Sequence, residues 1–86
     1  MQIKSKEVLD LKGVACPQNS AMALLKIESM TAGALLEIVV DEGEPILNVP
    51  LSLETEGHEI ISKVKMDKVW KILVKKASEG RNPDDL

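Results

Sequence analysis

The sequence predicts an α+β fold, a two-layer α/β sandwich in the order βαβαββ with two helices on one face of a mixed four-stranded sheet. Three observations predict it: four short aliphatic runs are typical of strands, two intervening segments repeat apolar residues at helical spacing, and the last two runs are close enough for a hairpin. The 86 residues suit one small domain, expected at residues 1–76. Residues 77–86 lack an apolar pattern and are expected to form a flexible tail.

The first strand is predicted at residues 7–11, followed by a loop at residues 12–15 that leads to Cys16. A helix should begin at Pro17 and end near Met30, before Gly33. Apolar and small residues at helical spacing mark its core-facing stripe, which contains Ser20, Ala23, Leu24, Ile27 and Met30.

Met22 and Leu25 lie off this stripe, within the first turns after Cys16. They belong either to a wide buried stripe or to an exposed apolar rim around the thiol, where a partner could dock. We favour the wide stripe, because broad apolar arcs are ordinary on helices that face a core.

The segment 35–40 is an almost unbroken aliphatic run with one charge, Glu37, as expected of a central strand. An acidic turn follows, and Asn48 is predicted to cap a second helix that ends near Glu56. Pro50 then lies in the first turn of this helix, where proline is tolerated.

Two further strands, at residues 59–65 and 69–76, are predicted to form an antiparallel hairpin across residues 66–68. Strand alternation sorts their side chains onto two faces. The face toward the helices should carry Ile60, Val64, Trp70, Ile72 and Val74, and the opposite face Ile61, Lys63, Lys65, Lys71, Leu73 and Lys75. We interpret the lysines as a solvated face, which Glu37 partly neutralises if it lies on the same side.

Cys16 is the only cysteine of the chain and directly precedes Pro17. Proline at the first position of a helix leaves the preceding residue as the N-cap, where backbone amides and the positive end of the helix dipole meet. A cysteine there is stabilised as a nucleophilic thiolate, whereas a cysteine that faces a core is only a small apolar side chain. Position alone leaves both interpretations open.

The composition argues against several functional classes. A net charge of -3 and the absence of Phe and Tyr count against a dedicated nucleic-acid binder. The chain has no apolar segment long enough for a membrane span and no signal-peptide pattern at its start, and its single cysteine cannot form an internal disulfide. We therefore expect a cytoplasmic protein. One thiol, one imidazole and no phosphate-binding glycine loop also predict neither a metal site nor a cofactor.

Four motifs occur in a fixed order: LDLKGVACP at residues 9–17, MTAG at 30–33, VP at 49–50 and EGHEI at 56–60. In this order and spacing they resemble the TusA/SirA family of small sulfur-carrier proteins. The resemblance covers about residues 8–76, and WKILVKK at residues 70–76 is similar to the family's last strand.

The resemblance implies a βαβαββ sandwich whose catalytic cysteine, here Cys16, accepts a sulfane sulfur as a persulfide and passes it on. Cysteine desulfurases and rhodanese-like proteins are the family's donors, and its acceptors serve tRNA thiolation, molybdenum-cofactor formation or sulfur metabolism. Such a sulfurtransferase-like carrier has little activity in isolation. A small residue at Gly13 suits the approach of a partner's active-site loop. The sequence names neither the donor nor the acceptor. It also leaves open whether the chain works as a monomer, which we expect, or pairs through an edge strand.

The chain departs from the family's Cys-Pro-x-Pro signature, because it reads Cys16-Pro17-Gln18-Asn19. Members with Cys-Pro-x-Asn look like a distinct branch, so we carry over the general carrier role and not tRNA thiolation. With Cys16 as the N-cap, Asn19 is the third helical residue, whose backbone N–H can point at the capping atom. We therefore expect Asn19 to stabilise the Cys16 thiolate better than proline does.

Two other groups of residues have competing interpretations. His58 could pair with Cys16, but we favour a histidine that satisfies the end of the second helix. Asp41, Glu42 and Glu44 resemble a cation site, but we favour a turn followed by a helix start.

Three rival functions remain beside the carrier. The first is a protein-interaction module in which Cys16 is structural, and the second is RNA binding through Lys63, Lys65, Lys71 and Lys75. The third is a redox sensor, for which the chain offers no resolving cysteine.

Overall fold

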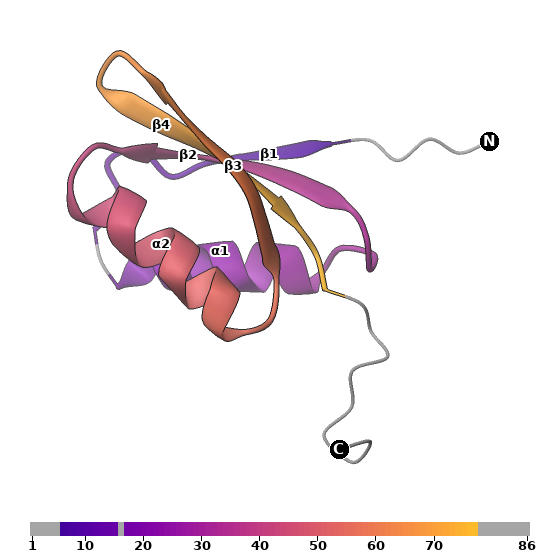
Figure 1. Ribbon diagram of the computed structural model, residues 1–86. Helices are drawn as coiled ribbons and strands as arrows, with labels where there is room; N and C mark the ends of the chain where they lie inside the picture. The colour runs from indigo at the N-terminus through magenta and orange to yellow at the C-terminus, as the bar shows by residue number, and fades with distance from the viewer. Residues whose placement is uncertain (1–5, 16, 78–86) are drawn as a thin grey trace.

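The computed structural model describes residues 6–15 and 17–77, and it has the predicted architecture (Figure 1). Its elements are β1 (Glu7–Asp10), α1 (Gln18–Glu28), β2 (Leu35–Asp41), α2 (Glu44–Thr55), β3 (Glu59–Met66) and β4 (Val69–Lys75). The prediction of a flexible tail falls mainly on residues 78–86, which lie outside the described residues.

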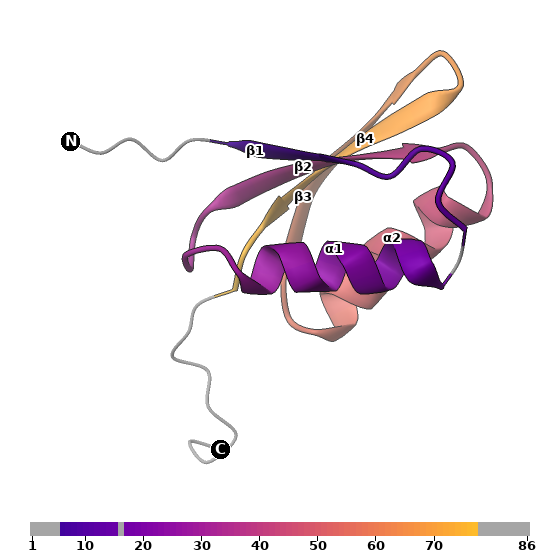
Figure 2. The ribbon, with the colours of Figure 1, turned by 180° about the vertical axis from the view of Figure 1, so that it is seen from behind.

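The four strands form one mixed sheet in the order β1-β2-β4-β3. β1 runs parallel to β2, while β4 is antiparallel to both β2 and β3. Both helices lie on the same side of the sheet, and the views from front and back (Figures 1 and 2) agree that α1 and α2 lie side by side. This arrangement confirms the two-layer sandwich.

The core lies between the two central strands and the helices. Alternate residues of β2 are buried, as are two residues of β4, and the helices bury their facing residues against them. Among the described residues, the fully enclosed apolar side chains are Ala23, Ile27, Leu36, Ile38, Val40, Val49, Leu53, Ile72 and Val74. Leu11, directly after β1, is also buried and holds the start of the following loop against this core.

α1 has the predicted inner stripe but not the predicted wide one. Ala23, Ile27 and Met30 are buried, whereas Met22 is 37% exposed and Leu25 is 71% exposed. The expectation of a wide buried stripe was therefore wrong. The sheet is covered by two helices side by side, so α1 needs only a narrow strip of its surface to contact the core and its neighbour.

α2 begins at Glu44 rather than at Asn48, which was the predicted cap. Gly43 adopts a φ of 109°, a conformation that L side chains rarely adopt, and Pro45 occupies the first turn, where its missing N–H costs no helical bond. Pro50 consequently lies inside the helix rather than in its first turn. Burial of the neighbouring Val49 and Leu53 against the sheet helps to hold the helix together around it.

The β3–β4 hairpin was predicted correctly. The prediction of which β3 side chains lie on which face of the sheet was wrong. Ile60 pairs with Val74 and Ser62 with Leu73, so Ile61 is an extra residue at a β-bulge. Beyond the bulge the alternation of β3 is inverted, because Lys63 now lies opposite Ile72, a core residue. Val64 lies opposite Lys71 on the open face, contrary to the prediction.

The inversion also divides the predicted lysine face. Lys63 and Lys65 lie on the helix side of the sheet, opposite Ile72 and Trp70, while Lys71 and Lys75 lie on the open side. These four lysines therefore do not form one basic surface, which removes the geometric basis for RNA binding through them.

Glu37 lies on the open face and partly neutralises the lysines there, as predicted. Its carboxylate is 2.8 Å from Nζ of Lys6 and 3.7 Å from Nζ of Lys71. The hydrogen bond from Lys6, together with both positive charges, holds the pKa of Glu37 below its ordinary value, although partial burial acts in the opposite direction. Of the two helices in the described part of the chain, neither is long and apolar enough to cross a membrane.

Candidate functional site

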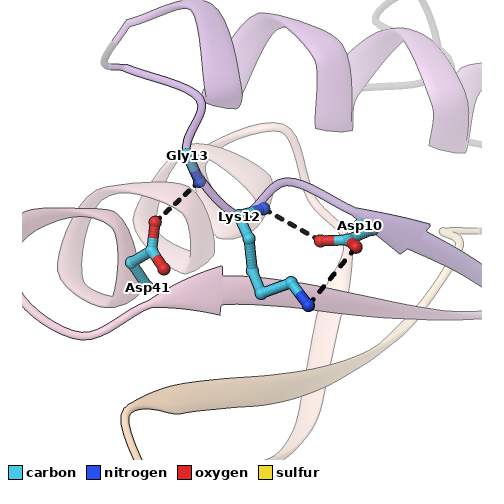
Figure 3. Close-up of polar contacts among 4 residues, drawn as sticks. All are labelled: Asp10, Lys12, Gly13 and Asp41. Carbon is cyan, nitrogen blue, oxygen red and sulfur yellow. Dashed lines mark hydrogen bonds and ion pairs between the residues drawn. The ribbon is translucent and has the colours of Figure 1, made fainter.

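The loop before Cys16 is held by the ends of the two parallel strands (Figure 3). Leu11 continues the pairing of β1 by donating its backbone N–H to the carbonyl oxygen of Val39 over 2.8 Å. The backbone N–H of Lys12 donates to Oδ1 of Asp10 over 2.9 Å, and that of Gly13 donates to Oδ2 of Asp41 over 2.7 Å. The carboxylates of two strand ends thus fix two successive amides of the loop.

Gly13 is required by its backbone conformation rather than by crowding. Its φ is +80°, and a Cβ at this position would meet no atom within 4 Å. The next amide, that of Val14, closes a tight turn on the carbonyl oxygen of Leu11 over 3.1 Å. The open space beside Gly13 agrees with the expectation that this side of the loop is uncluttered.

Cys16 itself lies outside the described residues, but the residues on both sides of it are fixed. The carbonyl oxygen of Ala15 accepts a hydrogen bond from the backbone N–H of Asn19 over 3.0 Å. The carbonyl oxygen of Pro17 accepts one from Ala21 over 3.1 Å. Pro17 rather than Cys16 is the residue at the N-cap of α1, which corrects the predicted helix start by one residue.

The backbone N–H of Asn19 was expected to point at Cys16. It donates to the carbonyl oxygen of Ala15, two residues before the N-cap. Stabilisation of the Cys16 thiolate by Asn19 stays a prediction, because Cys16 lies outside the described residues. The side chain of Asn19 is fully buried, and its Oδ1 accepts from the backbone N–H of Ser20 over 2.6 Å. Its Nδ2 has no acceptor among the residues that the structure describes. Asn19 therefore belongs to the packing of the first turn.

The amino-terminal end of α1 is free of acidic residues in its first turn. The helix dipole therefore places positive potential there that no side chain of that turn offsets. Gln18, the first residue of α1, is exposed. Met22 and Leu25 are exposed further along the same helix, so the alternative interpretation, an apolar rim, agrees with their positions.

His58 lies at the other end of the sheet. It directly precedes β3, whose first residue pairs with Lys75, and Lys75 also pairs with Leu35 at the start of β2. The loop of residues 12–15 that leads to Cys16, in contrast, follows the end of β1, whose last residue pairs with Val39 near the end of β2. Nδ1 of His58 accepts the backbone N–H of Ala77 over 3.0 Å. The structure therefore favours the structural interpretation of this buried histidine over a Cys–His pair.

The acidic residues at the end of β2 and directly after it are engaged with the protein itself. Asp41 binds the amide of Gly13, Glu42 lies 3.2 Å from Nζ of Lys65, and Glu44 opens α2. These contacts agree with a turn and a helix start. Sequence reasoning missed Asp41 as an anchor of the Cys16 loop. The signal lies in the sheet topology rather than in the local sequence, because the carboxyl ends of two parallel strands lie at the same edge of a sheet.

Comparison with known proteins agrees with the motifs. The family model described as sulfurtransferase TusA matches residues 7–76. The chain belongs to the TusA family. A protein of Archaeoglobus fulgidus named "Putative sulfur carrier protein" is 42% identical over 76 residues, which cover 87% of this chain and 86% of the relative. A second protein of that organism, with the same name, is 25% identical over 69 residues. This match covers 80% of this chain and 94% of the relative.

Solved structures share the TusA-family fold. The crystal structure of a SirA-like protein from Desulfitobacterium hafniense superposes with a TM-score of 0.72 at 18% identity, covering 86% of this chain and 100% of that one. The solution structure of a Helicobacter pylori protein gives a TM-score of 0.69 at 21% identity, covering 84% and 99%. The family description and the names of these relatives indicate a sulfur carrier, a role that implies a sulfur donor and a sulfur acceptor.

Proposed function

We propose that the protein carries sulfane sulfur as a persulfide on Cys16, taking it from a cysteine desulfurase or rhodanese-like donor and delivering it to an acceptor protein in sulfur metabolism. The observation that supports this most is the position of the only cysteine. It stands between Ala15 and Pro17, whose carbonyl oxygens are both tied into the first turn of α1. Gly13, Pro17, Gln18 and Asn19 are the supporting residues of this site.

The transfer needs no external oxidant or reductant. The Cys16 thiolate attacks the outer sulfur of a donor persulfide, R–S–SH. A new S–S bond forms as the donor's S–S bond breaks, and the donor leaves as the thiolate R–S⁻. The product is Cys16–S–SH, with the proton still on the outer sulfur. A nucleophile of the acceptor then attacks that outer sulfur, and the Cys16 thiolate leaves.

The helix end supplies the activation in this proposal mainly through its dipole. The amides of Asn19, Ser20 and Ala21 each have an acceptor among the described residues, so the proposal does not rely on a directed bond from them to the sulfur anion. The dipole acts over the first turn without a directed bond, and that turn carries no acidic side chain to oppose it. A thiolate that is only moderately stabilised is both a competent nucleophile and an acceptable leaving group.

The donor protein docks on Met22 and Leu25 in this proposal. Both side chains are exposed on α1, the helix that begins beside Cys16. At a rise of about 1.5 Å per residue, Leu25 lies roughly 10 Å along the helix from Gln18. A protein surface that delivers a persulfide to Cys16 would cover that distance easily, and burial of two large apolar side chains would stabilise the encounter.

Labelled sulfur tests the proposal. The protein is incubated with a cysteine desulfurase and cysteine that carries radioactive sulfur, then separated without reductant. We expect label on the protein that a thiol reductant removes, and no label on a Cys16→Ser variant. Equal label on both proteins would contradict it. So would the absence of label on the natural protein, both in this incubation and in a parallel one with a rhodanese-like donor that carries labelled sulfane sulfur. A Lys71→Ala variant, altered on the open sheet face, serves as the control and should load normally.

A further inference from the structure

We infer that Asp41 is a positioning residue for sulfur transfer, because its carboxylate fixes the loop that leads to Cys16 through the backbone N–H of Gly13. This inference rests on the proposed function. It assigns a role to a residue of β2, which is distant in sequence from the cysteine.

The contact between Asp41 and Gly13 joins parts of the chain that are 28 residues apart, over 2.7 Å (Figure 3). The other side-chain contact of the loop backbone is local, from Lys12 to Asp10. Among the described residues, Asp41 is the side chain from outside the segment 10–15 that bonds to the backbone of this loop. A charged acceptor makes a strong bond to an amide, so the contact is suited to hold the loop in one place.

Asp41 is itself held firmly. It is the last residue of β2 and pairs with Val69 of β4. The next residue, Glu42, donates its backbone N–H to the carbonyl oxygen of Lys68 over 3.3 Å. The carboxylate therefore projects from a strand end that is fixed to its neighbour, and its bond to the Gly13 N–H holds that residue in place.

Gly13 stands three residues before Cys16, at a backbone conformation that glycine adopts readily but does not hold by itself. Transfer between two sulfur atoms needs the attacking sulfur in line with the bond that breaks, so a small displacement of the loop costs rate. Loss of the Asp41 bond should therefore lower the turnover of sulfur transfer.

Comparison of two replacements of Asp41 separates a positioning role from a purely electrostatic effect on the thiolate. A carboxylate near a thiolate disfavours the thiolate, so removal of charge alone would favour its formation. A residue that acts only as a charge gives the same result with Asn as with Ala. A positioning residue does not, because the amide oxygen of Asn still accepts the Gly13 N–H while Ala has no acceptor.

The test compares Asp41→Ala with Asp41→Asn, using Glu42→Ala as the control that removes a neighbouring carboxylate paired with Lys65. In sulfur transfer from a cysteine desulfurase to the carrier protein, we expect Asp41→Ala to lower kcat about tenfold. The KM of the desulfurase for the carrier should change little. Asp41→Asn should recover most of that loss, and Glu42→Ala should match the natural protein. Equal kcat in the natural protein and Asp41→Ala, or equal losses in the Asn and Ala variants, would overturn the inference.

Two measurements need no sulfur donor and keep this inference separate from the proposed function. The rate of Cys16 alkylation by iodoacetamide across pH should differ between the Asn and Ala variants, and identical profiles would overturn the inference. If Asp41→Ala does not fold, hydrogen exchange of the Gly13 amide in the natural protein decides. We expect protection from exchange, and exchange at the rate of an unstructured peptide would overturn the inference. Failure of the natural protein to accept sulfur would instead count against the carrier role.

Discussion

The backbone N–H of Asn19 donates to the carbonyl oxygen of Ala15 over 3.0 Å, a helical bond that spans the position of Cys16. The departure from the Cys-Pro-x-Pro signature therefore adds a donor that the helix itself uses. The difference between the two signatures should be visible in the helix start and not in a hydrogen bond to the cysteine.

Replacing Asn19 by proline tests this relationship. Asn19→Pro removes the N–H, while the matched Asn19→Ala keeps it and loses the same side-chain bond to Ser20. We expect the pH midpoint of iodoacetamide alkylation to be the same in both variants, because the N–H is directed to Ala15. Their free energies of unfolding should differ by no more than about 1 kcal/mol, the worth of one such bond. A clearly higher midpoint in the proline variant would instead support a direct hydrogen bond from the Asn19 amide to the Cys16 thiolate.

The inner and outer faces of α1 should differ sharply in their effect on stability. Ile27→Ala removes a fully enclosed side chain and should lower the free energy of unfolding by about 2–5 kcal/mol. Leu25→Ala, two residues away and largely exposed, should change it by less than about 0.5 kcal/mol. Urea unfolding followed by circular dichroism measures both. Similar losses in the two variants would show that α1 is rotated from the orientation described.

Docking of the donor on the outer face of α1 makes a kinetic prediction. Leu25→Glu should raise the KM of the desulfurase for the carrier protein about tenfold, because a charge would be buried in an apolar contact. The kcat of the desulfurase should change little. Leu51→Glu places the same change on an exposed leucine of α2 and should leave KM unaltered. A normal KM for Leu25→Glu, or equal effects of both variants, would place the donor elsewhere.

Glu37 makes stability depend on pH in a defined direction. Its pKa is lowered in the folded protein, first by the hydrogen bond from Lys6 and then by the charges of Lys6 and Lys71. The ionised form is therefore favoured by folding, and this contribution is complete above the ordinary pKa of a glutamate. It is lost as the pH falls through the lowered folded value.

The Glu37→Gln variant should accordingly be less stable than the natural protein at neutral pH, by up to about 1 kcal/mol. The difference should shrink in the acidic range and vanish once Glu37 is protonated. Urea unfolding at a series of pH values measures it, with a Glu54→Gln variant of the exposed α2 surface as control. A difference that does not change with pH would contradict the described ion pairs.

The order and type of the elements could be predicted because periodicity alone decides them. The aliphatic run around Ile38, the helical spacing from Ala23 to Ile27 and the short connection after Met66 each allow one ordinary interpretation. The start of α2 was harder to predict from the sequence. Asn48 is a good cap by residue type, but Gly43 and Pro45 start the helix one turn earlier.

Other features depend on contacts that no local pattern reveals. The bulge at Ile61 reverses the facing of β3, yet the alternation of residue types continues through it. Asn19 is polar and is nevertheless buried, because the first turn of α1 packs onto the protein. Asp41 looked like part of a solvated turn, and its bond to Gly13 becomes evident only when β1 and β2 lie side by side.

In the proposed function, Cys16 takes up sulfur and gives it back. The most direct test is the mass of the intact protein at three stages: as purified, after incubation with a cysteine desulfurase and cysteine, and after a chase with an excess of a thiol acceptor. We expect a gain of one sulfur atom in the second stage and a return to the first mass in the third, with neither change in Cys16→Ser. An unchanged mass after the second stage, or a gain that the chase cannot reverse, would contradict it.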